Sequence, residues 1–141
     1  MKKVKIQIES TVEELDDAGL TESSERTESL ATGDLEKIGN EIRISYSETE
    51  ENITTKTLIT HRESEVRVKR EGGVEYEFIF REGETTSSLY SVPPYSFDTE
   101  IYTGKIRSSL TEEGGEISLL YYMTIGGAKK RTRMKIKVSG K

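Results

Sequence analysis

Apolar and polar side chains alternate along most of this chain, and a period of two predicts a succession of β-strands. The alternation is clearest over residues 4–8, 42–46, 66–68, 74–80, 117–125 and 134–138. Each such strand has one apolar and one polar face, as in a sheet that is buried on one side only. The pattern predicts burial of Val4, Ile6, Ile8, Ile42, Ile44, Val66, Val68, Phe78, Phe80, Phe97, Ile101, Leu119, Tyr121, Ile136 and Val138.

Short polar and glycine-containing segments separate these strands. The clearest hairpin turn signals are Gly39-Asn40, Glu50–Asn52, Gly72-Gly73, Gly114-Gly115 and Gly126-Gly127. Because glycine adopts positive φ without steric cost, such dipeptides favour tight turns. The acidic segment 13–19 is predicted to be a loop, and the polar segment 21–35 a long strand that ends at Gly39-Asn40. About ten antiparallel strands result.

Two irregular positions affect how these strands are arranged. The adjacent prolines at 93 and 94 predict an extended connection outside the sheet over Val92–Pro94, because proline cannot donate to a strand ladder. Gly104 lies inside a long strand and predicts a bulge or bend. We favour a single closed barrel of eight to ten strands over a sandwich, because closure removes exposed edges and Gly104 suits a barrel corner.

The composition agrees with one all-β domain that spans residues 1–141. Val, Ile and Thr together number 36, whereas Ala numbers 3, and β-branched residues suit a pleated sheet. The absence of cysteine excludes disulfides, thiolate metal sites and a cysteine nucleophile, and agrees with a reducing, cytoplasmic location. No secretory signal and no apolar stretch of membrane-spanning length is recognisable in the sequence.

Charge is unevenly distributed along the chain. The net charge is −5, yet residues 105–141 carry nine Lys and Arg against three Glu. Such a segment can bind anions. The simpler interpretation is that a basic strand lies beside acidic ones, since opposite charges across neighbouring strands attract each other.

Four segments carry a resemblance to a known family: GNEIRISYSE at 39–48, VRVKREGGVEYEFIFREGE at 66–84, LYSVPPYSFDTEI at 89–101 and EEGGEISLLYYMTIGG at 112–127. They resemble the YwiB-like family, also called DUF1934, of small bacterial proteins. The resemblance covers nearly the whole chain and implies a calycin-like, lipocalin-resembling β-barrel. It implies no particular chemistry. Relatives in this family often have one proline followed by Tyr-Gly, where this chain has Pro93-Pro94-Tyr95-Ser96.

No residue pattern predicts catalysis. His61 is the single histidine, so a zinc site would need three carboxylates around it and a catalytic triad would depend on this residue. We expect His61 to be a turn residue, and we expect no metal and no cofactor. The glycine pairs at 114–115 and 126–127 lie between strands, whereas a phosphate-binding loop leads into a helix. The sequence therefore predicts a protein that is not an enzyme.

The densest basic run offers one candidate binding surface. Lys129, Lys130, Arg131 and Arg133 lie close in sequence to Tyr121 and Tyr122, a combination found on nucleic-acid-binding faces. The isoelectric point near 5.1 argues against nucleic acid, since non-specific binding depends on neutralising phosphates. A macromolecule-binding module, for RNA or protein, remains the alternative function.

The barrel interior offers the favoured candidate, a non-enzymatic site for a small hydrophobic or anionic molecule. The residues proposed for it are Arg70, Tyr46, Tyr76, Tyr90, Tyr95 and Phe97. Arg70 continues the inward parity of Val66 and Val68, so its guanidinium could bind an anionic group or pair with an inward Glu. The simpler interpretation of the aromatics is a filled core. If a cavity exists, the proline segment with Tyr90 and Tyr95 would form its lip.

Overall fold

The computed structural model describes residues 1–140, which form ten β-strands and no helix. Every neighbouring pair is antiparallel, and the sheet order is β6-β5-β4-β3-β2-β1-β10-β9-β8-β7. The strands are β1 (Lys2–Leu15), β2 (Thr21–Ile38), β3 (Glu41–Glu50), β4 (Ile53–Arg62), β5 (Glu65–Glu71), β6 (Tyr76–Arg81), β7 (Thr85–Val92), β8 (Tyr95–Ser108), β9 (Gly115–Ile125) and β10 (Ala128–Gly140).

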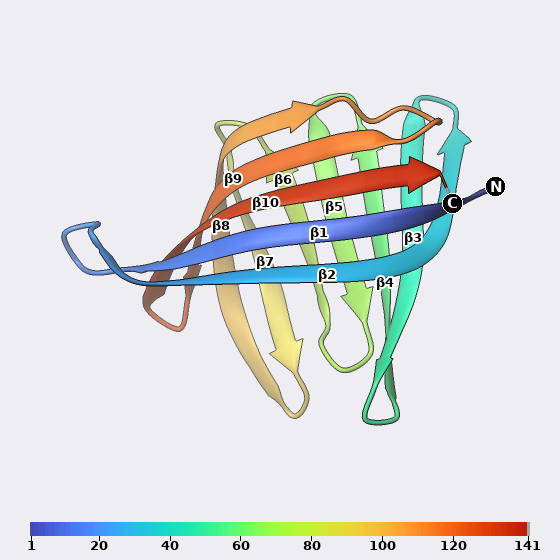
Figure 1. Ribbon diagram of the computed structural model, residues 1–141. Coiled ribbons are helices and arrows are strands. Elements are labelled where there is room, and N and C mark those ends of the chain that lie inside the picture. The colour runs from blue at the N-terminus through green and yellow to red at the C-terminus, as the bar shows by residue number, and fades with distance from the viewer. Residues whose placement is uncertain (141) are drawn as a thin grey trace.

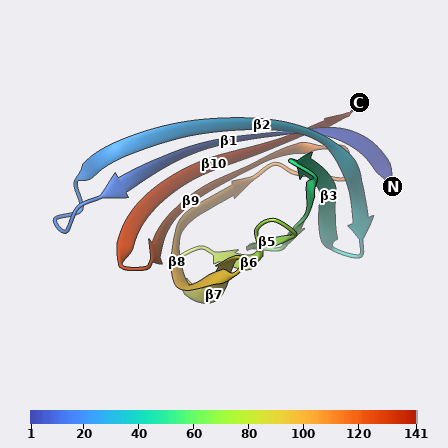
Figure 2. The same ribbon diagram turned by 90° about the horizontal axis from the view of Figure 1, so that it is seen from below.

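The sheet curls on itself until its two edge strands meet (Figures 1 and 2). β1 pairs with β10, so the first and last strands lie side by side. At the edges, Glu75 and Ser91 exchange two backbone hydrogen bonds of 2.8 Å. Between β6 and β7, the Thr86 hydroxyl donates to the Ile79 carbonyl over 2.6 Å. These contacts make a nearly closed barrel, which confirms the predicted fold.

The core lies inside this barrel and consists of the residues that the alternation selects. Among the predicted core residues, Ile8 and Ile42 are partly buried and contact the core, and the rest except one are buried. Leu35, Ile59 and Ile117 are buried as well. The prediction was wrong for Phe97, which is 43% exposed because it lies near the tip of the β7–β8 hairpin, beyond the packed interior.

A glycine lies at the point where β2 leaves β3. β2 pairs with β3 over residues 33–38 alone, whereas residues 21–32 pair only with β1. A Cβ atom at Gly33 would collide with the Ser45 carbonyl oxygen and lie 2.9 Å from the Tyr46 Cβ. The two strands approach this closely because Gly33 has no side chain.

Gly104 marks a bulge, as predicted. The register between β8 and β9 shifts between Thr103 and Lys105, so one extra residue lies on β8. The shift changes which side chains face inward, because neighbouring residues in a strand point to opposite faces. Thr103 is buried, and beyond the bulge Lys105 is exposed while Ile106 contacts the core.

Two connections differ from the prediction. Pro93 and Pro94 are the two central residues of the β7–β8 hairpin turn, with a cis peptide bond between them, and Val92 pairs with Tyr95. The predicted extended connection is therefore wrong. A tight turn keeps both prolines outside the strand ladder just as an extended connection would, so their missing N–H groups did not distinguish the two. The predicted loop at 13–19 begins too early, because β1 continues to Leu15 in pairing with β10.

Candidate functional site

The barrel interior is hollow at the end where β2 and β3 separate. A cavity of about 290 Å³ lies there, next to the packed core. Its apolar wall comes from Ile8, Ile59, Val68, Met134 and Ile136, and its polar groups come from Ser10, Ser29, Tyr46, Glu48, Thr57, Arg70 and Tyr76. Most of the barrel is filled by side chains, so the filled-core and cavity interpretations apply to different parts of the interior.

Arg70 brings a positive charge to this cavity. It pairs in register with Thr57 of β4 and Tyr76 of β6, so it shares their inward face. Its Nη2 atom lies 3.5 Å from Glu48 Oε1, and its guanidinium carbon lies 6.0 Å from the centre of the Tyr76 ring. Its Nε atom is buried and has no hydrogen-bond partner among residues 1–140. An unpaired buried donor is costly, so this N–H is a group that a bound acceptor would satisfy.

Aromatic rings form the wall beside Arg70. Tyr76 stacks on Phe78 with 3.9 Å between ring centres and on Tyr90 with 5.6 Å. Burial raises the pKa of Tyr76, and also that of Tyr46 across the cavity. Both phenols therefore stay neutral at neutral pH and keep their O–H donors.

The residues predicted for this site are brought together in part. Arg70, Tyr46 and Tyr76 line the cavity, and Tyr90 stacks behind Tyr76. Phe97 pairs in register with Tyr90, but it is 43% exposed and does not line the cavity. Tyr95 lies at the hairpin tip and is 68% exposed.

The sequence allowed Arg70 to pair with an inward Glu but did not identify that residue, which is Glu48 in the structure. The signal was present, because Glu48 continues the inward parity of Ile44 and Tyr46 on β3. Sequence reasoning missed Ser10 and Ser29, which line the cavity from β1 and β2. Two small polar residues in polar segments give no sign of inward orientation until the register is known.

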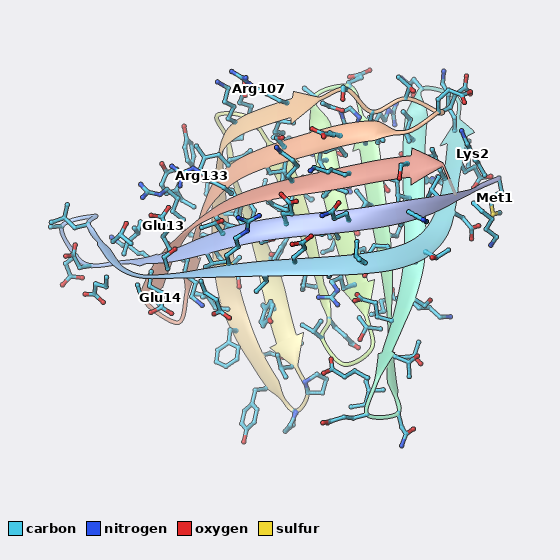
Figure 3. The ribbon with its side chains drawn as sticks, viewed as in Figure 1. Met1, Lys2, Glu13, Glu14, Arg107 and Arg133 are labelled. Atoms are coloured by element: carbon cyan, nitrogen blue, oxygen red, sulfur yellow. The ribbon has the colours of Figure 1, made fainter. Side chains whose placement is uncertain are left out.

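The predicted basic run does not lie on one face. Lys130 shares the inward parity of buried Thr132, whereas Lys129, Arg131 and Arg133 face outward. Figure 3 shows Arg133 and Glu13 on the same side of the molecule. The expected pairing of the basic strand with acidic neighbours is observed in the register of β1 with β10 and in its ion pairs.

Glu13 on β1 is the centre of these ion pairs. Arg131 donates to it through Nε at 3.0 Å and Nη2 at 2.8 Å, and Arg133 donates through Nη1 at 2.6 Å. The Thr21 hydroxyl donates over 3.0 Å. The hydrogen bond from Arg131 is the main reason that the pKa of Glu13 is about 2, against an ordinary value of 4.5.

Glu13→Gln is expected to lower the thermal stability at pH 7 and to have little effect near pH 2. The lowered pKa means that Glu13 stabilises the fold fully above about pH 4.5 and that this contribution disappears as pH falls to about 2. Thermal unfolding of both proteins at several pH values checks this. Glu14→Gln, at the exposed neighbouring position, is the control. A Tm difference for Glu13→Gln that stays constant from pH 7 to pH 2 would contradict the assignment.

The single histidine, His61, does not line the cavity. His61 is half-buried on β4, where burial lowers its pKa, and its Nδ1 lies 3.5 Å from the Ser108 hydroxyl. It belongs to a strand, so the predicted turn position is wrong. Within residues 1–140, no group of three or more His, Asp or Glu side chains could hold a metal ion. The same residues contain no helix that is long and apolar enough to cross a membrane.

Comparisons with known proteins agree with the fold. A family model described as "Domain of unknown function (DUF1934)" matches residues 6–136. The chain is 33% identical over 87 residues to the "Uncharacterized beta-barrel protein YwiB" of Bacillus subtilis (strain 168), and the match spans 62% of this chain and 61% of that relative's length. The crystal structure of the ywiB protein from Bacillus subtilis superposes with a TM-score of 0.86 at 28% identity, covering 99% of this chain and 92% of the other.

Proposed function

The chain belongs to the DUF1934 family and shares the barrel of its Bacillus subtilis relative, and we propose that it binds a small aromatic anion at the Arg70 cavity inside the barrel. This function is binding, not catalysis. Barrels of this strand number are wide enough to hold one small ligand, and the resemblance to calycin-like barrels agrees with such a role.

One observation carries the proposal: the buried Nε of Arg70 has no partner within residues 1–140. Glu48 engages the guanidinium through Nη2 alone, at 3.5 Å, which is a long contact. A carboxylate or similar anion could therefore accept from Nε in the orientation that arginine favours. Desolvation inside the cavity would strengthen that hydrogen bond.

The size and lining of the cavity restrict the rest of the ligand. A volume of about 290 Å³ lies just below the usual range for ligand pockets, which starts at roughly 300 Å³. Tyr76, Ile8 and Met134 line the cavity with apolar surface. A one- or two-ring molecule with one acidic group matches both features.

We expect 2-naphthoate to bind, and Arg70→Gln to weaken its binding roughly tenfold to hundredfold, because a hydrogen bond to a charged group contributes about 1.5–3 kcal/mol. Glu48→Gln should strengthen binding severalfold, since it removes a competing carboxylate from the guanidinium. Isothermal titration calorimetry measures both effects. The uncharged analogue 2-naphthylmethanol should bind weakly to all three proteins.

Lys69→Gln is the matched control, because it removes one positive charge from the outward face of β5 at the adjacent position. It should leave the affinity for 2-naphthoate unchanged. Equal losses in Arg70→Gln and Lys69→Gln would place binding outside the cavity. The proposed ligand class would be wrong if 2-naphthoate and benzoate both failed to bind at millimolar concentration.

A further inference from the structure

A second hollow lies on the outer surface of the barrel, over β8, β9, β10, β1 and β2. It is a groove of about 480 Å³, lined by five cationic side chains and one carboxylate. The cations are Arg26, Lys105, Arg107, Arg133 and Lys135, and the carboxylate is Glu9. We call these residues, with Ser118 and Leu120 on its floor, the outer groove. The outer groove shares Arg133 with the basic run at 129–133 and Met134 with the lining of the Arg70 cavity, and its other residues differ from both.

The strand register explains how residues far apart in sequence meet in the outer groove. Lys135 of β10 and Arg107 of β8 both pair with Ser118 of β9. In the next row, Arg133 and Lys105 both pair with Leu120. Cations therefore flank β9 on both sides, about 10 Å apart across two strand spacings and about 6.6 Å apart along each strand.

The bulge at Gly104 is what turns the β8 side of the outer groove outward. Upstream of it, Ile101 and Thr103 are buried at odd-numbered positions. Without the register shift, Lys105 and Arg107 would follow the same parity into the core. Bulges commonly redirect side chains at functional sites.

Three of the five cations form no ion pair, although Lys135 lies opposite Glu9 in the register of β1 with β10. Arg133 pairs with Glu13 at 2.6 Å, and Arg26 lies 3.9 Å from Glu9. Lys105, Arg107 and Lys135 make no ion pair within residues 1–140. The nearby Glu82 carboxylate instead accepts from the Ile106 backbone N–H over 2.9 Å. In a chain with a net charge of −5, this groove therefore has five cations against the one carboxylate of Glu9.

Two exposed aromatic side chains extend the outer groove along β8 and β9. Tyr102 and Tyr122 pair in register on the outward face, one row beyond Lys105 and Leu120. They are 44% and 37% exposed, and their ring centres lie 6.2 Å apart. Exposed rings beside a cationic track are the features that bind single-stranded nucleic acid, through stacked bases and neutralised phosphates.

We propose that the outer groove binds single-stranded nucleic acid, with its phosphates along Lys105, Arg107 and Lys135 and its bases on Tyr102 and Tyr122. The two tyrosines favour nucleic acid over an acidic polypeptide, because glutamate and aspartate side chains have no ring to stack. They also favour a single strand over a duplex, whose bases are already stacked on each other.

The test is fluorescence anisotropy with labelled rU12, dT12 and a 12-base-pair duplex, at 50 to 200 mM salt. The triple variant Lys105→Ala, Arg107→Ala, Lys135→Ala should bind rU12 or dT12 at least tenfold more weakly. Its slope of log affinity against log salt should be smaller by about two, since each neutralised phosphate contributes about 0.7 for single strands. A preference for rU12 assigns RNA, and a preference for dT12 assigns DNA.

The matched control removes three exposed cations elsewhere, by Lys37→Ala, Lys56→Ala and Arg62→Ala, and should leave the affinity unchanged. For stacking, Tyr102→Ala with Tyr122→Ala should weaken binding, whereas the corresponding double Phe variant should restore it. Four results would overturn the proposal: no binding of rU12 and dT12 at 50 mM salt, equal losses in both triple variants, tighter binding of the duplex, or displacement of rU12 by poly-glutamate at equal affinity.

Discussion

Replacing Gly33 with alanine is expected to destabilise the protein by roughly 2–3 kcal/mol, near the upper end for an overpacked site. The added Cβ would overlap the Ser45 carbonyl oxygen and lie 2.9 Å from both the Tyr46 Cβ and the Ile6 Cδ1. Backbone atoms of β3 cannot rotate away as a side-chain end can, so the two strands must separate. A loss of this size corresponds to a fall in Tm of roughly 10 °C for a chain of this length.

Gly104→Ala is the control for this prediction. Gly104 also lies in a strand without positive φ, but its nearest neighbours would be 3.5–3.6 Å from the added Cβ, which is ordinary contact. Its Tm should therefore change little. Chemical unfolding in urea gives the free energies of both variants. Similar losses of unfolding free energy in the two variants would contradict this explanation. They would mean that Gly33 is needed for its backbone flexibility and not for the close approach of β2 to β3.

The role of Gly33 links the fold to the cavity. On the N-terminal side of Gly33, β2 pairs only with β1, and after Tyr46 β3 pairs only with β4, so the barrel wall opens beside Ser29 and Glu48. If β2 also paired with β3 on the N-terminal side of Gly33, the two strands would close this opening. The sequence could not indicate this, because a single glycine in a polar strand does not reveal which backbone lies across from it.

The strands and the barrel could be predicted because a buried face imposes a period of two on each strand. The bulge was predictable because a glycine, Gly104, lies inside a long strand, and the register shift is found there. Arg70 followed from its parity with Val68. These inferences use only neighbours along one strand.

The outer groove could not be predicted in this way, because its residues come from different strands. The sequence drew attention to Lys129–Arg133, where charges are adjacent in the chain but point to opposite faces. The structure instead joins Lys105 and Arg107 to Lys135 across β9. Register and the effect of a bulge on orientation are both needed to find this grouping. Phe97 was misplaced for a related reason, since alternation gives the face of a strand but not where the core ends.

Phe80→Ala is expected to destabilise the protein by about 3–5 kcal/mol, whereas Phe97→Ala should cost less than about 1 kcal/mol. The Phe80 side chain is 1% exposed and its ring lies 4.7 Å from the Tyr121 ring, so its removal leaves a cavity in the core. Phe97 is 43% exposed and leaves none. Urea unfolding of both variants measures the difference. Because the two substitutions delete the same atoms, equal losses would mean that the β7–β8 hairpin packs into the core. Tyr95 at its tip would then not be free to form the lip of the cavity.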